Sequence, residues 1–98
     1  MPEITVAETD VRRVRDQIVD VREDEEVAEG MIPGAIHIPL GQLSARAGEL
    51  DRERPVITVC RSGRRSAVAA EQLEAAGFDA ATMGGGMVAW HAAGLPTS

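Results

Sequence analysis

The only cysteine of this chain, Cys60, lies where an apolar segment meets a run of arginines. The stretch "VITVCRSGRRS" begins with the β-branched residues 56–59, passes through Cys60, and then carries Arg61, Arg64 and Arg65. The thiolate is the nucleophilic form of cysteine, and neighbouring cations lower the pKa of a thiol below its ordinary value of about 8.5. We therefore predict a reactive thiol at Cys60, with a pKa below that of a free cysteine.

The residues that follow Cys60 are suited to holding an anion. Gly63 allows backbone conformations that other residues avoid, so successive N–H groups can point into one cavity. A helix that opens near Arg65 or Ser66 adds unpaired N–H groups and the positive end of its dipole. Hydroxyl and guanidinium groups supply further donors for oxyanions. The candidate site is therefore Cys60 as the catalytic nucleophile, with these substrate-binding residues: Arg61, Ser62, Gly63, Arg64, Arg65 and Ser66.

Each part of this site has a second interpretation. Arg65 stands at the end of the loop and is the predicted substrate anchor, while Arg61 and Arg64 are predicted to steer anions toward the site. The alternative is that these arginines only solvate the rim. For Cys60 the alternative is a small hydrophobic side chain that packs at the end of a core strand.

Strand-like and helix-like segments alternate along the chain, and they must position this site. The predicted strands are residues 3–6, 17–21, 34–40, 55–59 and 79–83. The predicted helices are residues 8–17, capped by Thr9 or Asp10, then 24–31, 41–50, 65–77 and 87–94. Such alternation predicts an α/β fold with a mostly parallel central sheet of about five strands and helices on both faces. Sites in such sheets form at the carboxyl ends of strands, where Cys60 falls.

Composition limits the classes of protein. A chain of 98 residues suits one domain with one core, and its formal net charge of −6 argues against a nucleic-acid partner. No apolar run approaches the roughly 18 residues that span a membrane, and the N-terminus does not read as a signal peptide. A single cysteine excludes an internal disulfide. We therefore predict a soluble, cytoplasmic protein without a membrane partner.

Charged and aromatic residues elsewhere are predicted to be structural. The acidic run at residues 23–29 is read as the solvated start of a helix. His37 falls in a strand pattern and is expected to be structural, and His91 is expected to be exposed. Trp90 is predicted to anchor the last helix in the core, with the alternative that its edge lines the entrance of the site.

Three segments resemble the rhodanese family of thiosulfate and persulfide sulfurtransferases. "CRSGRRS" after an apolar strand is similar to the active-site loop of the family. "DVREDEEVAEGMIPGAIHIPL" is similar to its strand ending in Asp-x-Arg, its short acidic helix and its Gly-x-Ile-Pro-Gly-Ala entry to the next strand. "MGGGMVAWHAAGLP" resembles its closing segment. The resemblance covers nearly the whole chain in the same order, and it implies a single rhodanese-like domain over residues 1–98.

The resemblance also implies roles for residues outside the loop. Asp20 and Arg22 would pair and hold the rim near the loop, and with Trp90 they form the predicted support of the site. The alternative is an ordinary surface ion pair worth about 1 kcal/mol or less. Many relatives have His where this chain has Met31, so any hydrogen bond made by such a histidine is lost here.

The implied reaction is sulfur transfer through a Cys60 persulfide. A small anionic donor, thiosulfate or a persulfide, would load Cys60, and a thiol or cyanide would accept the sulfur. A sulfur-relay protein is a further predicted partner, and neither a metal nor a cofactor is predicted. One alternative is a relay or carrier module that holds the persulfide and turns over slowly by itself.

A second alternative is a cysteine-dependent phosphatase or arsenate reductase. Those enzymes place five residues between the cysteine and the phosphate-binding arginine, and usually a histidine before the cysteine. Here four residues separate Cys60 from Arg65, and Val59 precedes the cysteine. The shorter loop predicts a smaller cradle, which favours sulfur over phosphoryl chemistry.

Overall fold

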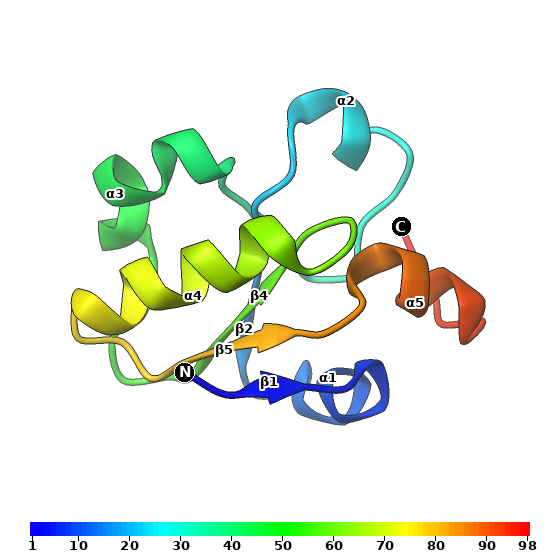
Figure 1. Ribbon diagram of the computed structural model, residues 1–98, viewed down its shortest axis with the longest axis horizontal. Helices are drawn as coiled ribbons and strands as arrows, with labels where there is room; N and C mark the ends of the chain where they lie inside the picture. Colours follow the sequence, from blue (N-terminus) through cyan, green and yellow to red (C-terminus); the bar gives the residue numbers. More distant parts are fainter.

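The structure is a computed structural model that describes residues 1–98. One sheet of five parallel strands forms its centre, in the order β1-β5-β4-β2-β3. Figure 1 labels β1, β5, β4 and β2 of this sheet. The strands are β1 Glu3–Ile4, β2 Gln17–Asp20, β3 Ile36–His37, β4 Val56–Val59 and β5 Ala80–Met83. The predicted α/β fold with about five parallel strands is confirmed.

Four helices connect the strands, and a fifth follows β5. They are α1 Val6–Arg12, α2 Asp24–Val27, α3 Leu43–Arg46, α4 Arg64–Ala75 and α5 Gly86–Ala92. Short 3-10 turns at Leu40–Gln42 and Ala47–Glu49 flank α3, so the predicted helix over 41–50 is a series of single turns. None of these helices has both the length and the apolar character that crossing a membrane demands.

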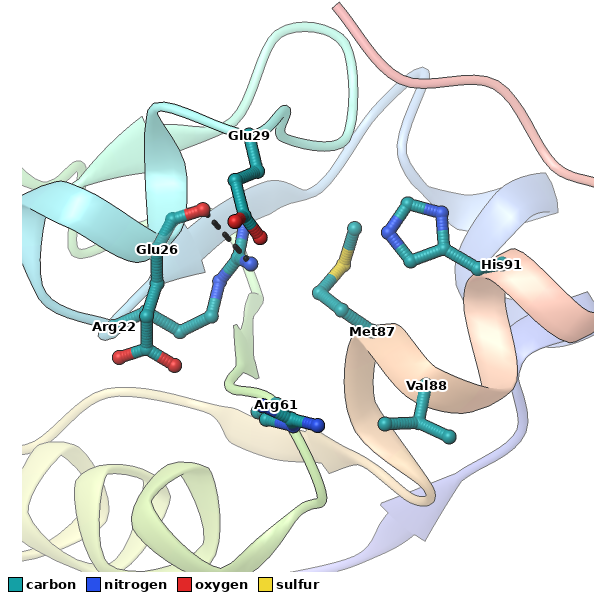
Figure 2. A pocket seen from close by; sticks show the side chains of 7 residues that line it. All are labelled: Arg22, Glu26, Glu29, Arg61, Met87, Val88 and His91. Carbon is teal, nitrogen blue, oxygen red and sulfur yellow. Dashed lines mark hydrogen bonds between the residues drawn. The ribbon is translucent and has the colours of Figure 1, made fainter.

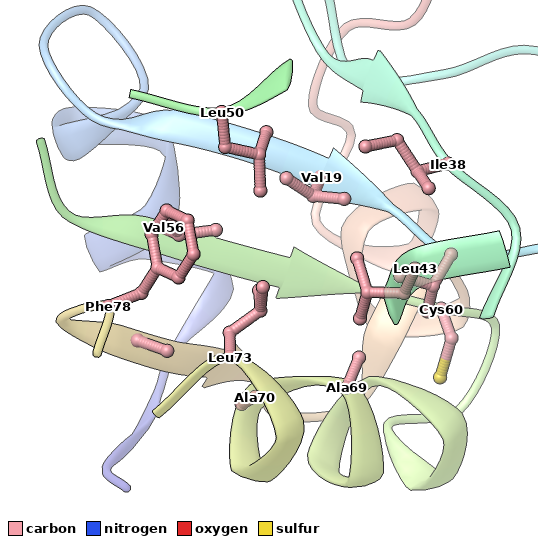
Figure 3. Packing of buried hydrophobic residues seen from close by; sticks show 12 residues of the cluster. Val19, Ile38, Leu43, Leu50, Val56, Cys60, Ala69, Ala70, Leu73 and Phe78 are labelled. Atoms are coloured by element: carbon pink, nitrogen blue, oxygen red, sulfur yellow. The ribbon is translucent and has the colours of Figure 1, made fainter. Parts of the chain in front are cut away.

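Two apolar clusters, one on each face of the sheet, form the core. Side chains alternate between the faces along a strand, so Val56 packs in the cluster with α3 and α4, whereas Ile57 and Val59 pack in the cluster with α5. Cys60 falls in the first cluster again. Figure 3 shows its sulfur at the edge of that cluster, turned toward the first turn of α4. The alternation along β4 therefore decides which helix meets the thiol.

The first helix begins earlier than predicted. It starts at Val6, and the side chain of Thr5 accepts a hydrogen bond from the backbone N–H of Glu8 at 3.0 Å. The prediction of Thr9 or Asp10 as the cap is wrong, since Thr9 is buried inside the helix and its hydroxyl donates to the carbonyl oxygen of Thr5. Thr5 takes the cap because its oxygen reaches the unpaired N–H of the third helical residue.

At the carboxyl end of the sheet, the start of α5 approaches the segment after β4 closely. The backbone N–H groups of Met87 and Val88 donate to the carbonyl oxygens of Cys60 and Arg61 at 2.8 and 3.1 Å. Gly86, with φ of 58°, lies so close that a β-carbon there would overlap the backbone of Cys60 and Arg61. The start of α5 and the segment after β4 therefore hold each other in place.

We predict that Gly86→Ala destabilises the protein by about 2 kcal/mol or more, because it adds both a clash and a strained positive φ. Denaturant unfolding measures this change. Gly48→Ala is the matched control, since a β-carbon at Gly48 meets nothing within 4 Å. Equal stability of the two variants would contradict the close approach.

Candidate active site

Cys60 comes directly after the carboxyl end of β4 and is almost completely buried, with 1% of its surface exposed. The chain then turns through residues 61–63 and enters α4 at Arg64, one residue before the predicted start. Gly63 precedes the helix with φ of 102°, which permits the turn that brings its own N–H back toward the sulfur. The loop therefore wraps around the thiol as the sequence predicted.

Hydrogen-bond donors converge on the sulfur. The N–H of Gly63 donates to Sγ of Cys60 at 3.1 Å, and the hydroxyl oxygen of Ser66 lies 3.4 Å from the same atom. Burial by itself raises the pKa of Cys60. The Ser66 hydroxyl and the backbone N–H groups of Ser66, Gly63 and Ser62 stabilise the thiolate and bring the pKa below its ordinary value. The direction of the predicted shift agrees, and these donors, more than the arginines, cause it.

A second row of hydroxyls orients Ser66. The hydroxyl of Thr82 on β5 donates to Oγ of Ser66 at 2.8 Å, which leaves the hydroxyl hydrogen of Ser66 free to point at the thiolate. Thr58 on β4 donates to the carbonyl oxygen of Ser66 at 2.7 Å. All three side chains are buried. Two strands of the sheet thus hold the serine that faces the sulfur, and nothing in the local sequence indicated the role of Thr82.

Arg65 does not project freely over the loop. Its guanidinium binds both carboxylate oxygens of Glu26, at 2.6 and 2.8 Å. This hydrogen-bonded pair lowers the pKa of Glu26 to about 2 and raises that of Arg65. The reading of residues 23–29 as only a solvated helix start is therefore wrong for Glu26, which joins α2 to the first turn of α4.

The other predicted substrate-binding residues are more open. Arg61, Ser62 and Arg64 are exposed, Gly63 is half-buried, and Ser66 is buried beneath them. A cavity of about 220 Å³ lies beside the loop, with Arg61 at its edge (Figure 2). It is lined by Arg22, Glu26 and Glu29 on one side and by Met87, Val88 and His91 of α5 on the other. Arg64 is not among the cavity residues.

The Asp20 and Arg22 pair is a buried one. The guanidinium of Arg22 donates to both carboxylate oxygens of Asp20 and to the carbonyl oxygen of Gly30 at 2.8 Å, and both side chains are at most 6% exposed. The alternative of an ordinary surface ion pair is therefore wrong. The pair ties the end of β2 to the segment after α2.

Trp90 and the histidines lie largely as expected. Trp90 is fully buried in the cluster with α5, and its indole N–H donates to the carbonyl oxygen of Pro96 at 2.8 Å. It is a core anchor and does not line the cavity. His37 on β3 lies 2.7 Å from the carbonyl oxygen of Arg22. His91 is exposed as predicted, and it also lines the cavity, which the sequence did not indicate.

Several residues of this region escaped sequence reasoning. Glu26 and Glu29 come from one segment and His91 from another, and the two segments meet only in the fold. Within each segment, the spacing of the residues gives only a weak indication that they lie together. Val88 and His91 lie three positions apart on α5 and share one side of the helix, whereas Glu26 lies on α2 and Glu29 in the turn that follows it. No group of three or more His, Cys, Asp or Glu side chains is arranged to hold a metal ion.

The geometry defines a class of site. A cysteine follows a central parallel strand, its sulfur accepts hydrogen bonds from the loop that follows, and a helix begins directly behind that loop. Such an arrangement stabilises a thiolate and any anion that forms on it, which is the requirement for covalent catalysis at sulfur.

Comparison with known proteins places the chain in a family. The family model of the rhodanese-like domain matches residues 5–93, so the chain belongs to the rhodanese-like domain family. A crystal structure of a rhodanese-related protein from Thermoplasma volcanium superimposes with a TM-score of 0.95 and 30% identity, and the match covers 100% of this chain and 98% of that one. The predicted family is therefore confirmed.

Relatives in this family extend to sulfurtransferases. Protein YtwF of Bacillus subtilis is 46% identical over 74 residues, covering 76% of this chain and 72% of YtwF. The thiosulfate sulfurtransferase GlpE of Shewanella oneidensis is 38% identical over 78 residues, covering 79% of this chain and 77% of GlpE. Family and relatives support, in general terms, a sulfurtransferase activity for this chain.

We predict that Ser66→Ala raises the pKa of Cys60. A hydrogen bond to a charged group contributes about 1.5 kcal/mol, so the midpoint should move upward by about one pH unit. The measurement is the rate of alkylation by iodoacetamide against pH, which follows the thiolate fraction and whose midpoint in the wild type lies below that of a free cysteine.

The matched control is Ser62→Ala, because Ser62 acts on the sulfur through its backbone N–H and keeps it in the variant. Thr82→Val removes the donor behind Ser66 and should move the midpoint in the same direction by a smaller amount. If Ser66→Ala titrates like the wild type while remaining folded, the assignment of the hydroxyl as a thiolate donor is wrong.

Proposed function

We propose that this protein is a sulfurtransferase that moves a sulfane sulfur from thiosulfate or a related donor to a thiol or cyanide through a Cys60 persulfide. The single observation that carries the proposal is the set of donors around Sγ, which favours a thiolate at a buried position. Membership of the rhodanese-like family and the relation to GlpE support thiosulfate as a donor. We also propose that residues 1–98 act as one domain.

In the first step the thiolate of Cys60 attacks the outer sulfur of thiosulfate. A sulfur–sulfur bond forms to Sγ, the bond between the outer sulfur and the sulfonate breaks, and its electron pair leaves with sulfite. No proton has to move, because the nucleophile is already ionised, so no general base beside Cys60 is needed. The resulting persulfide anion lies where the N–H groups of Ser62, Gly63 and Ser66 are directed.

In the second step an acceptor takes the outer sulfur. Cyanide or a thiolate attacks it, the bond to Sγ breaks, and the electron pair returns to Cys60 as a thiolate. The cycle is closed without a cofactor, and alternating release of the two products predicts ping-pong kinetics.

Arg65 is proposed as the anchor for the sulfonate, and Glu26 as its competitor. The guanidinium lies at the first turn of α4, next to the loop, but its two carboxylate contacts to Glu26 have to be exchanged for contacts to the donor. Both side chains are partly exposed, so water can assist the exchange and the cost is modest. Arg61 and Arg64 are both exposed, and their positive charges are proposed to attract the anionic donor toward the loop.

The small space around Sγ favours sulfur over phosphoryl chemistry. The N–H of Gly63 and the hydroxyl of Ser66 lie within 3.4 Å of the sulfur itself, so the donors suit a single added atom. A phosphoryl group needs donors around three oxygens beyond the sulfur. This supports the sulfurtransferase over a phosphatase or arsenate reductase.

A sulfur-carrier role is the second candidate, and the burial of Cys60 favours it. A cysteine residue that is 1% exposed is protected from solvent thiols, which suits the storage of a persulfide for a partner protein. The two roles differ in turnover, since a carrier loads once and discharges slowly to small acceptors.

We predict that incubation with thiosulfate adds one sulfur atom to the protein, and that Cys60→Ser abolishes the gain. Intact mass spectrometry measures both. Subsequent cyanide should remove the added sulfur and release thiocyanate in equal amount. An unchanged mass at saturating donor would refute the sulfurtransferase proposal, and loading without repeated turnover would favour the carrier.

We predict that Arg65→Ala raises the KM for thiosulfate about tenfold, the effect of losing one charged contact. Glu26→Gln should lower the KM, because it frees the guanidinium while keeping an oxygen for the backbone N–H of Glu23. Glu25→Gln, an exposed neighbour on α2, is the control for loss of one negative charge. If Arg65→Ala leaves the KM unchanged, Arg65 is not the anchor.

A further inference from the structure

Glu26 occupies the two terminal nitrogens of Arg65. Nη1 of Arg65 donates to Oε1 of Glu26 at 2.6 Å, and Nη2 donates to Oε2 at 2.8 Å. A guanidinium binds an oxyanion most strongly through two parallel N–H groups of this kind. An anion that enters the loop must therefore displace the carboxylate of Glu26 before it can use the same two groups.

Arg65 lies close enough to the reacting sulfur for this occupation to matter. Arg65 precedes Ser66 in the first turn of α4, and the hydroxyl oxygen of Ser66 lies 3.4 Å from Sγ of Cys60. The negative charge of Cys60 contributes to raising the pKa of Arg65, so the guanidinium lies within electrostatic range of the sulfur. Glu26 is therefore paired with an arginine that the charge of the sulfur reaches.

The carboxylate of Glu26 can release Arg65 without losing all of its partners. Its Oε1 also accepts a hydrogen bond from the backbone N–H of Glu23 at 3.1 Å, as part of the cap of α2. The guanidinium of Arg22 donates to the backbone carbonyl oxygen of Glu26 at 3.4 Å. Figure 2 shows this contact, with the side chain of Glu26 turned away from Glu29. The pair with Arg65 is thus an exchangeable contact of a residue that other bonds hold in place.

The two classes of sulfur donor differ in what they need from Arg65. Thiosulfate carries a sulfonate, whose oxygens can take over the two N–H groups that Glu26 occupies. The persulfide of a small uncharged thiol has no oxyanion, so it can deliver its outer sulfur to Sγ without displacing the carboxylate. Competition with Glu26 therefore adds a cost to the first class of donor and not to the second.

We propose that Glu26 determines the donor specificity of Cys60, because oxyanion donors such as thiosulfate must compete with its carboxylate for Arg65 and persulfide donors do not. This inference rests on the proposed function, since both classes of donor load the same sulfur. Glu26 acts through Arg65 and is a specificity-determining residue, not a catalytic one.

Both loading reactions end in the same persulfide of Cys60. With a persulfide donor, the thiolate of Cys60 attacks the outer sulfur of the protonated donor, a bond forms to Sγ, and the sulfur–sulfur bond of the donor breaks. The electron pair leaves with the donor thiolate, and the proton stays on the transferred sulfur. With thiosulfate the electron pair leaves with sulfite, whose oxygens are the atoms that Arg65 would hold.

The test compares the loading of Cys60 by thiosulfate and by the persulfide of 2-mercaptoethanol. Intact mass spectrometry follows the gain of one sulfur atom with time. Glu26→Gln removes the charge that competes for Arg65 and keeps an oxygen for the backbone N–H of Glu23. We expect the ratio of the thiosulfate rate to the persulfide rate to rise about fivefold, the effect of losing one partly exposed ion pair. An unchanged ratio, with both donors still loading, would overturn the inference.

Glu25→Gln is the matched control, because it removes an exposed charge from the same helix without touching the pair of Glu26 and Arg65. Its ratio of rates should equal that of the wild type. Because each ratio is taken within one variant, a change in the reactivity of Cys60 itself cancels. An equal rise in both variants would mean that general negative charge repels thiosulfate, and would overturn the specific role of Glu26.

A measurement without sulfur transfer separates this inference from the proposed function. Sulfate has the oxygens of a sulfonate but no sulfane sulfur, and binding at Arg65 should slow the alkylation of Cys60 by iodoacetamide. At constant ionic strength, we expect half-maximal protection at about fivefold lower sulfate in Glu26→Gln than in the wild type, and no protection in Arg65→Ala.

The outcomes of the two measurements are distinguishable. Equal protection by sulfate in the wild type and Glu26→Gln, or protection that persists in Arg65→Ala, would overturn the inference even if both donors load Cys60. Failure of both donors to load Cys60 would instead refute the proposed function, and the sulfate measurement would still decide whether Glu26 competes for Arg65.

Discussion

The almost complete burial of an ionisable thiol is the constraint on which this end of the molecule depends. Burial of Cys60 opposes its ionisation, whereas the hydroxyl of Ser66 and the loop N–H groups favour it, and together they bring the pKa of the thiol below its ordinary value. Those donors in turn need supports. Thr58 and Thr82 hold Ser66 from two strands, and the close approach of Gly86 holds the backbone that carries the sulfur. The ionisation of the Cys60 sulfur therefore depends on contacts made by β4, β5 and the starts of α4 and α5.

Some charged side chains near the loop after Cys60 are paired with each other and stabilise the site, whereas others are unpaired. Asp20 and Arg22 form a buried pair that ties β2 to the segment after α2. Glu26 and Arg65 connect that region to α4. Once these four charges are neutralised, the two that stay open around the cavity have opposite signs, Glu29 and Arg61. Although the protein as a whole carries a net negative charge, the charges left unpaired around the cavity therefore include one of each sign.

The fold was largely predictable because the hydrophobic pattern and the turn residues agree with each other along the chain. Residues 56–59 are all β-branched and a polar loop follows them. This local pattern was enough to predict both the strand and the position of its carboxyl end. The cap of α1 was not, because Thr5, Thr9 and Asp10 are all chemically able to cap a helix. Only the geometry of the first turn, with Thr5 oxygen 3.0 Å from the N–H of Glu8, decides between them.

The sequence alone determined the position of the proposed nucleophile, the glycine that bends its loop, and the sheet that delivers both to one edge, because these depend on neighbouring residues and on the alternation of side chains along a strand. Tertiary structure decided the partners of that loop. Arg65 meets a carboxylate 39 positions away, and Ser66 meets a hydroxyl 16 positions away. Many acids and hydroxyls in the chain could make such contacts. Which of them do so follows from the packing of α2 and β5 against the start of α4, and no local pattern encodes it.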